Sequence, residues 1–178
     1  MMVSTLTFGM LVYGDKGNAD PHLIFIISFI FSTLLTIVTV LLFKREGKLS
    51  DLDASIREQR VQPLVYGTIY YGLGFLILKY FQATPLIQGL MFCYALNTAI
   101  VWYITQYWKI SIHAIGLGGP FVALWLFGIH APIIMGLSMI MVCVSRVILK
   151  AHTPAQVIAG AGLAMGLAYV ELTYLFLY

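Results

Sequence analysis

Two cations and a histidine, Arg146, Lys150 and His152, interrupt a very apolar part of the chain. A charge inside a bilayer costs on the order of 3 kcal/mol or more unless it faces protein, water or a counter-ion, so such residues are candidates for function. If one helix holds both cations, Arg146 and Lys150 are i, i+4 neighbours on one face. They would then present two positive charges to the same point, which indicates a site for an anion.

Two further groups of residues at the ends of other apolar stretches could do related chemistry. Arg57 and Arg60 would share a helix face at i, i+3, and Lys109 precedes Ser111 and His113. The last two stand at the expected start of a helix, where free backbone N–H groups and the helix dipole favour an anion. Taken alone, His113 is more readily explained as an ordinary interfacial histidine.

These residues are set in a chain that is too apolar for a soluble domain. Of its 178 residues, 61% are hydrophobic and 10% are charged, whereas soluble globular domains have about 25% charged residues. Six apolar stretches approach the ~20 residues that cross a bilayer as a helix. They cover roughly 22–43, 64–81, 84–107, 114–129, 131–149 and 155–178. The sequence therefore predicts an all-α integral membrane protein, a bundle of six transmembrane helices.

The same pattern predicts a single membrane domain over residues 1–178. The longest polar interval, about 44–63, has room only for a short surface helix. Residues 1–21 begin apolar but are too short to span, so we expect an interfacial segment or a half-buried helix there. Cys93 and Cys143 lie within apolar stretches, where cysteine most often behaves as a small hydrophobic side chain.

Six consecutive spans would place the intervals 44–63, 107–113 and 150–154 on one face of the membrane. That face holds eight of the ten Lys and Arg residues. The positive-inside rule would put it in the cytoplasm. However, five of the eight are the cations named above, which an anion site would itself require. The sequence therefore leaves the orientation open.

The segment around His152 resembles a known family signature. Ser145-Arg146, followed after five residues by His152, matches in spacing the third signature of the type 2 phosphatidic acid phosphatase superfamily. These are the lipid phosphate phosphatases related to vanadium haloperoxidases. The family has an acid four residues after the histidine, and Gln156 stands there in this chain. A Gln carbonyl can accept the ring N–H and fix the tautomer, but it supplies no charge.

The second signature of that family, Pro-Ser-Gly-His, is similar to the segment that contains Ser111 and His113. The Ser and the His are in register, Ile112 replaces the Gly, and Lys109 lies near the place of the Pro. A β-branched Ile makes this loop stiffer than the glycine would.

The first signature, a Lys, six residues and then Arg-Pro, resembles the end of the polar interval. Arg60 corresponds to its arginine and Arg57 supplies a second cation, while Pro63 follows after two further residues. The three resemblances therefore occur in the family's order, in the loops after the first, third and fifth expected spans.

The resemblance implies a phosphatase that needs no metal and no cofactor. His152 would be the nucleophile that forms a phosphohistidine, and His113 would be the general acid that protonates the leaving oxygen. Gln156 would orient the nucleophile. The other site residues would hold the phosphoryl oxygens by charge-assisted hydrogen bonds; they are Arg57, Arg60, Lys109, Ser111 and Arg146.

The implied partner is a lipid phosphate: phosphatidate, phosphatidylglycerophosphate or a polyprenyl pyrophosphate, with its apolar tail between helices. The resemblance also implies a multi-pass protein of a bacterial inner membrane. The sequence contains no Walker loop, nucleotide fingerprint or metal-spaced carboxylate cluster, so it gives no support for metal-dependent chemistry. We expect no nucleic-acid partner.

Two other interpretations of the same residues stay open. A non-catalytic protein that binds or transports a lipid phosphate needs the cations and Ser111, but not the histidine chemistry. A structural membrane subunit needs neither, because basic residues beside a membrane can meet lipid head groups. Glu171, deep in the last apolar stretch, is a further polar residue whose partner the sequence does not name.

Overall fold

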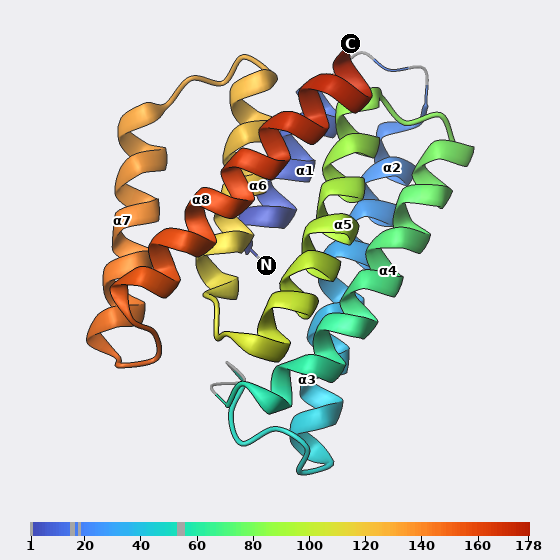
Figure 1. Cartoon of the computed structure of the whole chain (residues 1–178). Helices are drawn as coiled ribbons and strands as arrows, with labels where there is room; N and C mark the ends of the chain where they lie inside the picture. The colour runs from blue at the N-terminus through green and yellow to red at the C-terminus, as the bar shows by residue number, and fades with distance from the viewer. Residues whose placement is uncertain (1, 15–16, 18, 53–55) are drawn as a thin grey trace.

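The computed structural model describes residues 2–14, 17, 19–52 and 56–178, and every regular element in these ranges is a helix (Figure 1). The α-helices are α1 (Met2–Gly14), α2 (Pro21–Phe29), α3 (Leu35–Arg45), α4 (Val61–Tyr80), α5 (Pro85–Tyr107), α6 (Ile112–Leu126), α7 (Pro132–Ile148) and α8 (Pro154–Glu171). The all-α fold class is confirmed.

Three short elements join or extend these helices. The π-helical stretch η1 (Ile30–Leu34) connects α2 to α3, the 3₁₀ turn η2 (Glu58–Arg60) leads into α4, and the π-helical stretch η3 (Leu172–Leu177) extends α8. The sequence predicted a short surface helix in the polar interval 44–63. In the described residues, that interval is instead a loop that ends in the single turn η2. Residues 53–55 of that interval lie outside the described residues.

Four helices of the described chain are long and apolar enough to cross a membrane. They run over Pro21–Arg45, Glu58–Tyr80, Pro85–Tyr107 and Pro154–Leu177. The helices α6 and α7 are also apolar, but they have only 15 and 17 residues. An integral membrane protein is the class that these helices support.

Several helix starts follow directly from the sequence. The helices α2, α5, α7 and α8 each have Pro in the first turn, where the missing N–H is not needed and the fixed φ suits the helix. Thr153 adds a capping box to α8, since its hydroxyl accepts from the Gln156 N–H and the Gln156 side chain reaches back.

The apolar core lies away from the three loops of the predicted site. Leu78, Leu90 and Met91 are fully buried there, at the end of the α4–α5 hairpin that is uppermost in Figure 1. Phe8 and Leu11 of α1 join the same core and are also fully buried. The inner face of α1 (Met2–Gly14) therefore belongs to the apolar core.

The helix α7 stands apart from the α4–α5 hairpin and contacts α6 and α8 (Figure 1). It has no buried residue among its 17. Its outward side chains are large and apolar, including Ile133, Ile134, Leu137 and Met141. An exposed apolar surface of this extent is typical of a face that contacts a membrane or another protein.

Two glycines let α6 and α8 approach closely. A Cβ atom on Gly118 would lie 2.6 Å from the Cβ of Ala164, and one on Gly160 would lie 2.9 Å from the Ser111 carbonyl oxygen. Small residues at helix crossings allow such contact in membrane proteins. The close approach holds the start of α6 against the start of α8, where the Ser111 N–H donates to the Gln156 carbonyl over 3.3 Å.

Candidate functional site

The guanidinium of Arg60 joins all three loops of the predicted site. Its Nη1 donates to the Ile110 carbonyl over 3.0 Å, and its Nη2 lies 3.4 Å from Nε2 of His152. The side chain is 2% exposed. Segments 50 and 92 residues away in the sequence thus meet on one buried cation.

The hydrogen bonds around His152 define which ring nitrogen carries the proton. Nδ1 lies 3.1 Å from Oε1 of Gln156, and the backbone N–H of Thr153 donates to the same atom over 3.1 Å. Because a backbone N–H needs an acceptor, that atom is the amide oxygen, and Nδ1 must be the donor to it. Nε2 therefore carries the lone pair, which faces the donor of Arg60.

The environment of His152 also keeps the ring neutral. The side chain is 6% exposed, and its burial, together with the charge of Arg60, lowers its pKa to about 4. Lys109 and His113 act in the same direction, while the Gln156 hydrogen bond opposes them. A neutral imidazole whose lone pair is on Nε2 has the electronic form of a nucleophile.

Ser111 stands at the start of α6, between the other two loops. Its hydroxyl oxygen accepts from the Ala114 N–H over 3.4 Å, so it caps the helix. The residue is fully buried. Since the oxygen is the acceptor in that contact, the hydroxyl hydrogen remains able to donate to a ligand.

A cavity of about 400 Å³ lies within the helix bundle, and Arg60 is the residue of the cluster described above that lines it. Arg60, His113 and Arg146 line it, along with the polar side chains of Thr36, Thr39, Tyr70 and Asn97. Its size falls in the range of small-molecule sites, which are commonly ~300–1,000 Å³. The cavity thus combines positive groups with an otherwise mainly apolar and hydroxyl-bearing lining.

Lys109 adds positive charge to the same region, although it is not one of the residues that line the cavity. Its ammonium interacts electrostatically with both Arg60 and His152. Partial burial, followed by the charge of Arg60, lowers its pKa. The structure therefore brings five of the predicted residues around one point: Arg60, Lys109, Ser111, His152 and Gln156.

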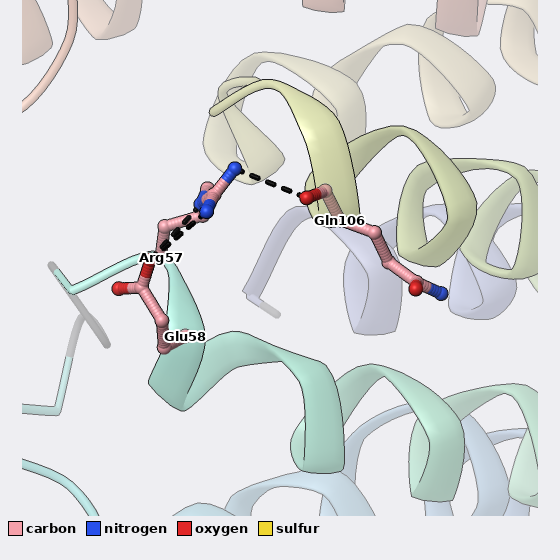
Figure 2. A network of polar contacts seen from close by, with 3 residues as sticks. All are labelled: Arg57, Glu58 and Gln106. Atoms are coloured by element: carbon pink, nitrogen blue, oxygen red, sulfur yellow. Dashed lines mark hydrogen bonds and ion pairs between the residues drawn. The ribbon is translucent and has the colours of Figure 1, made fainter.

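Arg57 points elsewhere, as Figure 2 shows. Its Nη1 donates to the Gln106 carbonyl over 3.1 Å, and its guanidinium forms an ion pair with Glu58, also at 3.1 Å. Gln106 belongs to the last turn of α5, whose carbonyls lack helical partners. Arg57 thus caps the end of α5, whereas Arg60 turns inward to His152.

The expectation that Arg146 and Lys150 share a helix face is wrong, because α7 ends at Ile148. Lys150 adopts a left-handed conformation with φ +53° and is exposed. The turn that follows is tied to α7, since the Arg146 carbonyl accepts from the N–H groups of Ala151 (3.0 Å) and His152 (3.2 Å). This turn directs His152 back into the protein.

The polar lining of the cavity is the part of the site that sequence reasoning missed. Thr36 and Thr39 lie three residues apart, so they share a helix face, and the Thr39 hydroxyl is 2.9 Å from that of Tyr70. Asn97 lines the cavity from α5. The sequence pattern that could have revealed these residues is polar side chains at helical spacing within apolar stretches. Such side chains face the interior of a bundle.

No protein-family model matches this chain, and no curated protein or solved structure is significantly similar to it. Within the described ranges, no group of three or more His, Cys, Asp or Glu side chains could hold a metal ion.

Proposed function

We propose that the protein is a metal-independent lipid phosphate phosphatase that works through a phosphohistidine on His152. The observation that carries this proposal is the state of that ring: neutral, with Nδ1–H held by Gln156 and the Nε2 lone pair beside a buried arginine. The sequence resemblance to the type 2 phosphatidic acid phosphatase superfamily supports it, because residues of all three signatures lie within one cluster.

The proposed ligand is a phosphomonoester or pyrophosphate on a lipid: phosphatidate, phosphatidylglycerophosphate or a polyprenyl pyrophosphate. Arg60, Lys109, Arg146 and the Ser111 hydroxyl offer donors to the phosphoryl oxygens. The apolar part of the cavity offers room for part of the tail. Arg60 must turn its Nη2 from His152 to the phosphoryl group, which frees the Nε2 lone pair at the moment the substrate binds.

In the first chemical step, the Nε2 lone pair of His152 attacks phosphorus. The N–P bond forms as the P–O bond to the lipid breaks, and His113 donates a proton to the leaving oxygen. The cations stabilise the negative charge that gathers on the equatorial oxygens. In the second step, His113 takes a proton from water, which attacks phosphorus; the N–P bond breaks and inorganic phosphate leaves.

Gln156 is the feature that favours a second candidate function, a non-catalytic binder or transporter of lipid phosphate. While Nε2 is phosphorylated and Nδ1 keeps its proton, the ring is a cation. A carboxylate would stabilise that cation, but the amide of Gln156 offers only its dipole. Binding needs no such stabilisation, so the cationic pocket alone would serve it.

As part of the same proposal, α6 and α7 complete a six-span bundle in a bacterial inner membrane. With 15 and 17 residues, they extend about 22 and 26 Å at 1.5 Å per residue. The hydrocarbon core is ~30 Å thick, so the bilayer must thin slightly around these two helices.

The test is release of inorganic phosphate by the purified protein in detergent with EDTA present, from the three lipid classes named above. We expect release from at least one of them, lost in His152→Ala and kept in His130→Ala. His130 is the matched control because it is exposed in another loop, where its ring lies against that of Trp125 with the centroids 4.4 Å apart. Folded protein that binds these lipids but releases no phosphate from any would exclude the phosphatase and leave the binder.

A further inference from the structure

Glu171 is a carboxyl group buried among helices that carry almost no other charge. It is the last residue of α8, is 5% exposed, and lies within a helix long enough to span a membrane. The helix α5 has no charged residue, and α8 has only this one. Glu171 lies about 25 Å along the helix from Pro154, at 1.5 Å per residue, so it is remote from the phosphate site.

The amide of Asn97 on α5 is the main partner of this carboxyl group. Its Nδ2 donates to Oε2 of Glu171 over 3.2 Å, and both side chains are buried. The thiol of Cys93, one turn earlier on α5, is the second interacting neighbour and a weak donor. The Oε1 atom of Glu171 and the Oδ1 atom of Asn97 remain buried, with no hydrogen-bond partner in the described chain.

A single proton on Glu171 would satisfy both of these oxygens. A protonated carboxyl group and a primary amide can pair in a ring of two hydrogen bonds. In that ring the amide N–H donates to one carboxyl oxygen, and the acid O–H donates to the amide oxygen. The structure contains the first bond, and the two oxygens left over are those that the second bond would join. A buried acceptor without a donor costs ~1–3 kcal/mol, so the proton removes two such costs.

The charged groups nearby do not offer the carboxyl group a counter-ion. Among the titratable side chains of the helices that pack on α8, Cys93 is the one that interacts with Glu171 in the described chain. His113 on α6 and Arg146 on α7 line the cavity from helix ends that border the site loops. A charge without a partner in such surroundings is neutralised by protonation.

We propose that Glu171 and Asn97 form an intramembrane proton-binding site in the wall of the cavity, whose ligand is a proton exchanged through that cavity. Asn97 connects the Glu171 carboxyl group to the cavity, because its side chain donates to that carboxyl group and also lines the cavity. An ionisable group in this position is the element that proton-linked membrane proteins use. The phosphate chemistry proposed above does not require it, so this inference stands independently of that function.

The test is infrared spectroscopy of the protein in lipid bilayers at pH 7, which separates the C=O band of a carboxylic acid from the bands of a carboxylate. We expect an acid band in the native protein that is absent in Glu171→Gln and shifted in Asn97→Leu. Glu171→Gln should fold, because its amide can make both bonds to Asn97. The control Glu46→Gln should keep the band, since Glu46 is exposed and paired with Lys48.

Three results would overturn the proposal. The first is a native spectrum with no acid band at pH 7, or with one that Glu171→Gln leaves intact. The second is a band that responds neither to D₂O nor to raised pH, because the proton would then be sealed in the structure rather than exchanged. The third is a thermal stabilisation by Na⁺ over choline that Glu171→Gln abolishes, because a metal cation would then join the two oxygens.

Discussion

At one end of the bundle, Leu78, Leu90 and Met91 are fully buried in an apolar core, whereas at the other end the buried side chains include Arg60 and His152. The first end is held by close packing, which is not directional. The second is held by directional bonds from a guanidinium and an amide to backbone and ring atoms. We infer that the apolar end supplies most of the stability, and that the end with Arg60 and His152 holds the groups for chemistry.

The largest expected contrast comes from truncating one residue at each end. His152→Ala should lower phosphate release by at least about 10³-fold, as removal of a nucleophile does, with a small change in stability. Leu90→Ala should cost about 2–5 kcal/mol of unfolding free energy, because it leaves a cavity in the core, while the folded fraction keeps its turnover. Phosphate release measures the turnover of both variants, and unfolding by denaturant measures their stability. Equal loss of stability in both variants would remove the distinction between the ends.

A second contrast compares two arginines: Arg57, which bonds Gln106 in the last turn of α5, and Arg60, which bonds Ile110 just beyond that helix. Arg60→Lys should reduce kcat/KM by about 10²-fold, because one ammonium cannot replace the fork that bonds both Ile110 and His152. Arg57→Lys should change kcat/KM little, since Arg57 caps the outer end of α5. Steady-state kinetics of phosphate release measures kcat/KM for both variants. A larger loss of kcat/KM in Arg57→Lys than in Arg60→Lys would indicate that Arg57, not Arg60, binds the phosphate.

The positions of the helices were largely predictable from the sequence, because long apolar stretches closed by Pro have few alternatives. The expected stretch 84–107 corresponds to α5 at Pro85–Tyr107, and 155–178 corresponds to the helix at Pro154–Leu177. The stretches 114–129 and 131–149 correspond to helices of only 15 and 17 residues. Hydrophobicity alone does not fix where a helix begins and ends, so it could not separate a full-length span from a shorter apolar helix.

The sequence named several of the residues that cluster around His152, but not the directions of their side chains. Arg57 and Arg60 are alike in sequence, and only the tertiary contacts send one to Gln106 and the other to His152. The left-handed turn at Lys150 carries no local signal, because lysine is not favoured there. The role of Gln156 as an acceptor for His152 was expected from the family resemblance, and the hydrogen bond at 3.1 Å agrees with it.

A third prediction concerns the pH dependence of stability that His152 causes at the polar end. The pKa of His152 is lowered from 6.5 to about 4 by burial and by Arg60. Between those values the unfolded chain binds a proton at this residue and the folded protein does not, so stability should fall by about 3 kcal/mol as pH drops from 6.5 to 4. Unfolding of the native protein and of His152→Gln at pH 7, 5.5 and 4 measures this. An equal decline in His152→Gln would assign the pH dependence to other groups.

The smallest effect concerns the turn that carries His152 inward. Lys150 has φ +53°, where a residue with a Cβ is strained by about 1 kcal/mol and glycine is not. Lys150→Gly should therefore raise the unfolding free energy by up to about 1 kcal/mol and leave turnover unchanged, since the side chain is exposed. Lys150→Ala removes the same charge but keeps the Cβ, so it should give no gain. A gain in the Ala variant would indicate a charge effect instead.

The most direct measurement is the site of phosphorylation after alkaline quenching of the protein with a lipid phosphate in EDTA. We expect a phosphoryl group on Nε2 of His152, found by mass spectrometry and by separation of the two phosphohistidine isomers, because Gln156 holds Nδ1. Phosphate release with the label on Nδ1 of His152, on another residue or on none would contradict the proposed nucleophile, and release that EDTA abolishes would contradict a metal-independent reaction.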